Sequence, residues 1–136
     1  MKVELDRLRT GYSVLLVWLL WAHVPVMAAA ALWNRAVPVP TAVGVATLLA
    51  LIYQLTLLRF GTSAITRSIA NVVLVGEPAL LLVLFAGHPW QMDVHMYFFA
   101  VLALNIAWFD RVPVFLGAVV TALHHLFLLY LLPYAV

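Results

Sequence analysis

The sequence predicts an all-α protein, a polytopic bundle of about five transmembrane helices, and three observations support this prediction. Of the 136 residues, 67% are hydrophobic and only 9% are charged, whereas a soluble domain has about 25% charged residues. The apolar residues form runs of about 20, the length that an α-helix needs to cross the hydrocarbon core of a bilayer. Short segments with polar, proline or glycine residues separate these runs, namely NRAVPVP, RFGTSAITR, GHPW and DRVP.

The first span is expected at 11–33. The charged segment MKVELDRLR precedes it, as in a signal peptide. The apolar run is longer than the core of a typical signal peptide, however, and has no convincing cleavage site before Trp33. We therefore expect a retained helix rather than a cleaved leader.

The later spans follow the separating segments in order. Pro113 suits the first turn of the last helix, where the missing N–H of proline leaves no hydrogen bond unmade. The four later spans are expected at 41–59, 67–86, 91–109 and 112–134. Together with the first, they form one predicted transmembrane domain over residues 1–136.

Positive charge predicts the orientation of the bundle, because cytoplasmic loops are enriched in Lys and Arg. On the predicted outer side of the membrane, Arg35 is the only basic residue. The N-terminus is therefore expected in the cytoplasm, and five spans would leave the C-terminus outside. The basic residues on the predicted cytoplasmic side are Lys2, Arg7, Arg9, Arg59, Arg67 and Arg111.

Several function classes are excluded or disfavoured by composition. The chain has no cysteine, which excludes disulfides, thiolate-ligated metals and cysteine nucleophiles. The basic residues are scattered and form no patch for nucleic acid. There is no GxSxG, HExxH or phosphate-binding loop, and the carboxylates Glu77 and Asp93 are too few for a di-iron bundle. We therefore do not expect a hydrolase or a di-iron oxygenase.

Histidines inside the apolar runs are the most informative feature. A rise of about 1.5 Å per residue places His23 and the adjacent pair His124 and His125 roughly 18–20 Å from the cytoplasmic side, and His95 roughly 24 Å from it. All four then fall in one slab in the outer half of the membrane. Polar groups there are costly and usually face a bundle interior. Since imidazole ligates metal ions and haem iron, we predict that these histidines bind a cofactor.

Neighbouring residues extend the predicted site. Met27 follows His23 by four residues and lies on the same helix face, and Met96 directly follows His95. Asp93 could accept a hydrogen bond that fixes an imidazole tautomer. Thr121 precedes the histidine pair by one helical turn.

Glu77 is a second unusual group, because it lies near the middle of the third span. Pro78 follows it and leaves the carbonyl of Leu74 without its helical donor. We expect the Glu77 carboxyl to be neutral or paired with a polar group such as Asn71 or Asn105.

Simpler interpretations compete with a binding site. A single histidine such as His23 is more often a packed residue that is hydrogen-bonded to a neighbouring helix, and His88 is a loop residue. His124 and His125 point about 100° apart on a helix, so both can hardly ligate one ion. The stretch MYFF after His95 is more typical of lipid-facing or core packing than of a ligand site.

A resemblance adds to this interpretation. The run GHPWQMDVHMYFFAVLAL, the turn DR and the run TALHHLFLLYLLPYAV resemble the N-terminal membrane region of bacterial methyl-accepting chemotaxis proteins. Related regions precede histidine kinases and diguanylate cyclases. The matching features are Asp93 two residues before His95, the charged turn, and the double histidine followed by a proline. The resemblance covers about 88–136 and extends more loosely to His23.

The resemblance implies a non-enzymatic sensory input domain for chemotaxis or related signal transduction. It further implies a location in the bacterial inner membrane and a homodimer. In such proteins a sixth span leads into a cytoplasmic signalling domain, and we expect both to lie beyond the residues of this chain. The bound species would be copper, zinc or haem b. The nearby methionines favour copper and the aromatic surroundings favour haem. Two alternatives remain open: a small cytochrome b-like or histidine–metal electron-transfer protein, and a proton-linked polar network.

Overall fold

A computed structural model describes residues 2–131, and over this range the chain is helical without any strand. This confirms the all-α prediction. Five α-helices and one short 3-10 helix follow one another along the chain. Their bounds are α1 Lys2–Asn34, α2 Val39–Phe60, α3 Ala64–Leu84, α4 Gln91–Leu104, η1 Asn105–Trp108 and α5 Arg111–Leu131.

Four of these helices, α1, α2, α3 and α5, are long and apolar enough to cross a membrane. The predicted span at 91–109 is not one long helix, because it divides into the 14 residues of α4 and the 4 residues of η1. The Asn105 side chain donates to the carbonyl of Val101 at 3.1 Å, a contact that competes with regular helix geometry. The end of the predicted span 112–134 lies outside the described residues.

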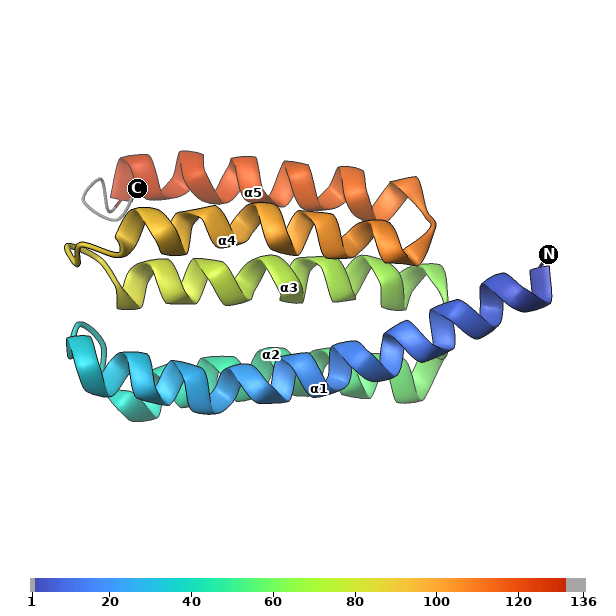
Figure 1. Ribbon diagram of the computed structural model, residues 1–136, viewed down its shortest axis with the longest axis horizontal. Helices are drawn as coiled ribbons and strands as arrows, with labels where there is room; N and C mark the ends of the chain where they lie inside the picture. Colours follow the sequence, from blue (N-terminus) through green and yellow to red (C-terminus); the bar gives the residue numbers. More distant parts are fainter. Residues whose placement is uncertain (1, 132–136) are drawn as a thin grey trace.

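Successive helices run antiparallel, so that the loops alternate between the two ends of the bundle (Figure 1). The central helix is α3, which packs against α1, α2, α4 and α5. On α2, Ala42, Ala46 and Ala50 repeat every four residues and are at most 1% exposed. This stripe of small side chains lets α2 approach its neighbours closely, as in other membrane bundles.

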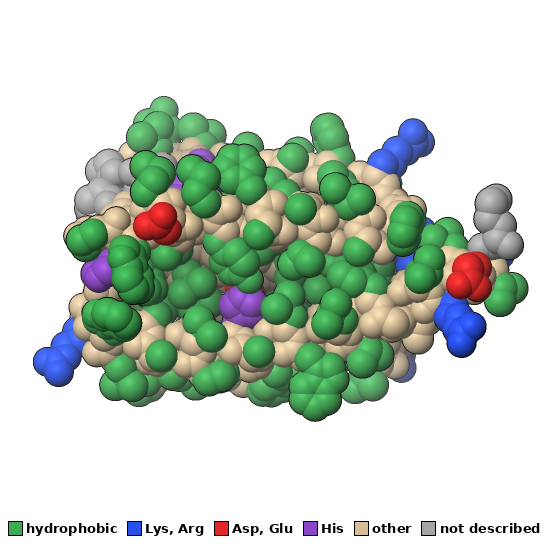
Figure 2. Space-filling model, in the orientation of Figure 1, with side chains coloured by type: hydrophobic (Ala, Val, Ile, Leu, Met, Phe, Trp, Pro, Cys, Tyr) green, Lys and Arg blue, Asp and Glu red, His purple; other side chains and the backbone are tan. Residues whose placement is uncertain are grey.

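The surface is divided as expected for a membrane protein. Hydrophobic side chains cover the flank of the bundle, whereas Lys and Arg side chains project mainly at its ends (Figure 2). The first turns of α1 extend beyond the other helices (Figure 1). With 33 residues, α1 is about 50 Å long, which exceeds a hydrocarbon core of about 30 Å.

Ionic and polar contacts hold the turn between η1 and α5. The Arg67 guanidinium forms an ion pair with Asp110 at 2.8 Å and donates to the carbonyl of Thr62 at 2.6 Å. Arg9 donates to the carbonyl of Trp108 at 2.9 Å. The turn at Asp110 and Arg111 is therefore bonded to both α3 and α1 and is not simply exposed to solvent.

The charge of Asp110 is stabilised by these contacts. Burial alone would raise the pKa of its carboxyl, but the N–H of Val112 and the guanidinium groups of Arg67 and Arg9 outweigh this and hold the pKa below its ordinary value. The ion pair is thus complete at neutral pH.

Candidate functional site

The helix α4 carries polar groups on two different faces. His95 and Phe98 face α5, whereas Trp90, Asp93 and Tyr97 line a separate hollow. Spacings of three and four residues keep the members of each group on one side of the helix. The predicted histidines are accordingly distributed over two sites rather than one.

The first site is a pair of imidazoles between α4 and α5. The Nε2 atoms of His95 and His125 lie 2.9 Å apart, and the ring centroids lie 4.6 Å apart. The two residues are separated by most of an antiparallel hairpin, so the pair depends on the α4–η1–α5 turn. The structure therefore brings together two of the four histidines that the sequence predicted as ligands.

Hydrogen bonding determines which nitrogen of His125 carries the proton. Its Nδ1 lies 2.7 Å from the backbone carbonyl of Thr121. A carbonyl only accepts, so Nδ1 must be the protonated nitrogen that donates to it. In the neutral ring, Nε2 of His125 then has a lone pair directed at His95, which must donate its own Nε2–H. The Thr121 carbonyl thus orients His125, as ligands of metals are commonly oriented.

His124 lies beside this pair without joining it. Its ring is perpendicular to that of His125, with centroids 5.5 Å apart, which agrees with the divergence expected for adjacent helical residues. Within residues 2–131, its buried Nε2 and the buried Oγ1 of Thr121 have no hydrogen-bond partner. Buried polar atoms of this kind are uncommon and call for an explanation.

Phe98 organises the three imidazoles. It is 3% exposed, and its ring centroid lies 5.0 Å from that of His125, 5.3 Å from His124 and 5.8 Å from His95. The stretch MYFF was expected to face lipid or pack in the core, and the contact of Phe98 with the imidazoles was not predicted. The only sequence signal was the three-residue spacing from His95, which puts Phe98 on the same helix face.

His23 belongs to the second site. Its Nδ1 donates to the carbonyl of Leu19 at 2.8 Å, and its Nε2 accepts from the hydroxyl of Tyr97 at 2.6 Å. The His23 and Tyr97 rings are also stacked, with centroids 5.8 Å apart. Both ring nitrogens are engaged, so the structure does not bring His23 to the histidine pair.

The predicted neighbours of the site are dispersed. Met27 is fully buried in an apolar cluster with Ala46 and Leu84, whereas Met96 is 51% exposed. Asp93 lines the hollow beside Tyr97. Met27 therefore packs in a separate cluster, and Met96 lies largely at the surface.

Glu77 is fully buried. Among the described residues, neither of its carboxyl oxygens has a hydrogen-bond partner. Of the two expected states, neutral or paired, the pairing with Asn71 or Asn105 is therefore not found; Asn105 bonds to its own helix and Asn71 lies against Gly117. The phenol of Tyr97 is close enough to interact electrostatically with Glu77.

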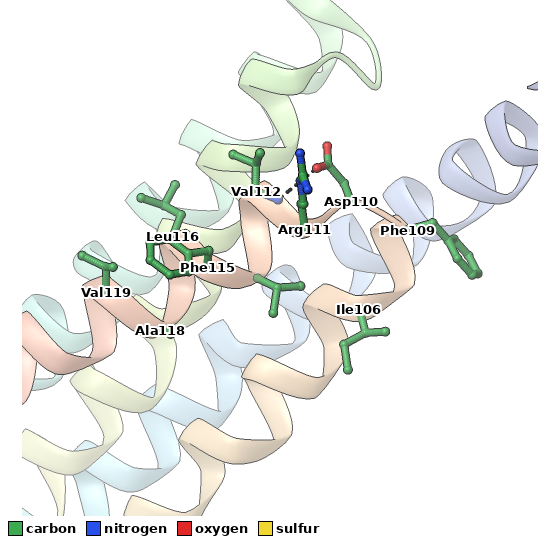
Figure 3. A pocket seen from close by; sticks show the side chains of 10 residues that line it. Ile106, Phe109, Asp110, Arg111, Val112, Phe115, Leu116, Ala118 and Val119 are labelled. Atoms are coloured by element: carbon green, nitrogen blue, oxygen red, sulfur yellow. Dashed lines mark hydrogen bonds between the residues drawn. The ribbon is translucent and has the colours of Figure 1, made fainter.

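A groove of about 940 Å³ on the η1–α5 hairpin lies away from these polar groups. Figure 3 shows its mainly apolar lining, with Phe109, Val112 and Phe115 on the surface of the η1–α5 hairpin and Asp110 at its rim. Phe115 is 74% exposed. Such a surface suits contact with lipid chains and offers little for polar chemistry.

The histidine pair provides two imidazole nitrogens for a ligand. In the part of the chain that the structure describes, no three His, Asp or Glu side chains are arranged around a common metal position. Comparison with known proteins finds no matching family model, curated protein or solved structure. The function must therefore be inferred from the geometry of the site.

Proposed function

We propose that this protein is a membrane-embedded sensory input domain that binds a transition-metal ion, copper or zinc, between α4 and α5. The observation that supports this most directly is the 2.9 Å separation of the His95 and His125 Nε2 atoms. Two imidazole nitrogens that face each other share one proton, and a metal ion can take the place of that proton.

The spacing of the pair is close to what one ion needs. Zinc–imidazole bonds are about 2.0–2.1 Å long, so two nitrogens on one tetrahedral ion lie about 3.3 Å apart. The pair would open by less than about 1 Å. His124 is one residue from His125 and has a buried Nε2 that lacks a partner within residues 2–131. Because adjacent helical residues diverge by about 100°, His124 lies beside the proposed ion rather than among its ligands.

Haem b fits the site less well than a bare ion. The imidazole centroids are 4.6 Å apart, and Phe98 packs against both rings. A porphyrin between them would displace Phe98 and separate α4 from α5. The geometry accordingly favours an ion-binding sensor over the cytochrome b-like alternative.

We further propose that α4 and η1 together form a fifth membrane span. Fourteen α-helical and four 3-10 residues extend over about 29 Å, which matches a hydrocarbon core of about 30 Å. The basic residues Arg9, Arg67 and Arg111 then lie at one end and Arg35 at the other. This distribution supports a cytoplasmic N-terminus in the bacterial inner membrane.

Signalling would proceed through the α4–α5 hairpin. Binding of an ion draws on residues of both helices, so it favours one relative position of α4 and α5 over another. The ion pair of Arg67 and Asp110 connects the turn of this hairpin to α3 at the proposed cytoplasmic end. In a homodimer with a cytoplasmic output domain, as the resemblance implies, this shift of α4 relative to α5 would alter the activity of the output domain.

Metal analysis of the purified full chain in lipid nanodiscs tests this proposal. After loading with Cu⁺ or Zn²⁺ and removal of excess metal, we expect about one ion per chain by mass spectrometry. The variants His95→Ala and His125→Ala should lose it. His88→Ala, which removes a histidine from the loop between α3 and α4, should retain it.

Two outcomes would contradict the proposal. Equal metal content in all three variants would show that the pair is not the binding site. A Soret absorption band that disappears with His95→Ala would instead identify haem as the bound group.

A further inference from the structure

We propose that the hollow beside α4 is a second binding site, which takes a small organic ammonium ion from the outer side of the membrane. The hollow has a volume of about 360 Å³ and is lined by Leu81, Trp90, Asp93, Val94 and Tyr97. Figure 2 shows this flank of the bundle, where the surface is hollowed beside α4. This inference does not depend on the metal site.

The lining residues form one stripe along α4. Asp93 and Tyr97 are four residues apart and share a face of α4, and Trp90, which also lines the hollow, directly precedes the helix. Leu81 of α3 lies across from them. The stripe places a carboxylate between two aromatic residues, with an apolar wall opposite.

This combination of side chains recognises an organic cation. Aromatic faces attract ammonium groups through their quadrupoles, and the Asp93 carboxylate supplies the opposite charge. A hard metal ion such as Ca²⁺ or Mg²⁺ needs several oxygen ligands, whereas Asp93 is the only acidic residue among the described residues that line the hollow. The chemistry therefore points to an alkylammonium group rather than to an inorganic cation.

Tyr97 is held in place by α1. Its hydroxyl donates to Nε2 of His23 at 2.6 Å, and His23 in turn donates from Nδ1 to the carbonyl of Leu19. The stacked His23 ring further restricts the Tyr97 ring. His23 is thus a positioning residue that preorganises the aromatic wall of the hollow.

Glu77 is a second acidic group near the hollow. It precedes Leu81 by one helical turn and therefore lies on the same face of α3, below the hollow. It is completely buried, and its two carboxyl oxygens have no hydrogen-bond partner among residues 2–131. A buried carboxyl is costly without a partner. An ammonium group bound beside Tyr97 would supply one, because Tyr97 lines the hollow and interacts electrostatically with Glu77.

Position along the bundle suggests the direction of entry. Trp90 lies at the start of α4 and packs against Trp33, with ring centroids 5.4 Å apart. Tryptophans are enriched at membrane interfaces. The hollow therefore opens near the end of the bundle opposite to Arg9 and Arg67, which is the proposed outer side.

Calorimetric titration with ethanolamine tests the proposal. The full chain is placed in nanodiscs made of phosphatidylglycerol, which has no amine. We expect saturable binding that quenches or shifts tryptophan fluorescence. Asp93→Asn, Trp90→Leu and Glu77→Gln should each weaken it at least tenfold. Asp6→Asn, an exposed carboxylate in the first turns of α1, should change it less than twofold.

A second set of nanodiscs distinguishes two sources of the ammonium group. If the lipid headgroup occupies the hollow, phosphatidylethanolamine will compete with ethanolamine and lower its apparent affinity. If the natural ligand is free in solution, the two lipids will give the same affinity. Either result supports an ammonium site.

Two other outcomes would overturn it. One is the absence of saturable binding in phosphatidylglycerol. The other is an equal effect of Asp93→Asn and Asp6→Asn, which would indicate general charge attraction rather than a site. Far-UV circular dichroism and the thermal unfolding midpoint of each variant show whether it keeps the native fold.

Discussion

His23 and His125 have the same local hydrogen bond but different partners. Each ring donates from Nδ1 to the carbonyl four residues earlier, His23 to Leu19 and His125 to Thr121. Each therefore presents an Nε2 lone pair to α4. His23 meets the hydroxyl of Tyr97, which is a donor, whereas His125 meets a second imidazole in His95.

This difference separates a structural histidine from a candidate ligand. With the Tyr97 hydroxyl, both ring nitrogens of His23 are hydrogen-bonded. A metal ion at His23 would have to replace a hydrogen bond that is already made. The two imidazoles share one proton between two basic nitrogens, and both nitrogens remain suited to bind a cation. Residue type and depth in the bundle are similar at the two sites, so the partner on α4 decides the role.

The largest expected effect separates these two histidines directly. His125→Ala should weaken metal binding by about a hundredfold or more, because it removes one of two ligands and not an outer partner. His23→Phe should change the affinity less than about threefold. Competition with a chromophoric chelator in nanodiscs measures both values. Loss of metal with His23→Phe would show that the two sites act as one.

Gly117 tests how the histidine pair depends on the position of α5. A Cβ atom at this residue would lie 2.5 Å from Oδ1 of Asn71 and 3.0 Å from Cδ2 of Leu102. Gly117→Ala should therefore lower the free energy of unfolding by about 1–3 kcal/mol and weaken metal binding, because α5 must move outward.

Gly44→Ala is the matched control for Gly117→Ala. Nothing lies within 4 Å of a Cβ atom at Gly44, and alanine favours helix by about 1 kcal/mol. Unfolding with a denaturing detergent compares the two variants. Equal stability of the two would mean that the close approach of α3 and α5 does not control the site.

Asp110 tests the turn that brings His95 and His125 together. Its folded pKa lies below the ordinary value of 3.8, so the ion pair with Arg67 stabilises the fold fully above that value. The stabilisation, about 2 kcal/mol, is lost as the pH falls through the lower folded pKa. Asp110→Asn should lower the unfolding midpoint at pH 6, and this difference should shrink progressively as the pH falls below 3.8. A difference that is independent of pH would contradict this account.

The smallest expected effect concerns the satisfied histidine. Tyr97→Phe keeps the stacked ring but removes the donor to Nε2 of His23, which should lower the free energy of unfolding by about 1 kcal/mol. Metal content should not change, because His23 has no second imidazole beside it in the described structure. A Tyr97→Phe protein that bound an additional ion would show that partner chemistry alone does not define the two roles.

The all-α fold could be predicted from the sequence because apolar runs of about 20 residues and their breaks are local properties. The depth of each histidine also followed from its position in a run, since helical rise is constant. We expected histidines of the fourth and fifth spans to lie close together, and His95 and His125 do so. The similar predicted depth of these two residues made that contact geometrically possible.

The sequence by itself therefore determined the helices, their apolar surfaces and the level at which polar groups occur. Only the tertiary structure decided that Tyr97 faces His23, that Phe98 packs against both His95 and His124, and that Glu77 interacts with Tyr97. The physical reason is that helix rotation about its own axis depends on packing against all neighbours at once. A rotation of about 100°, one residue, exchanges the groups that meet across an interface.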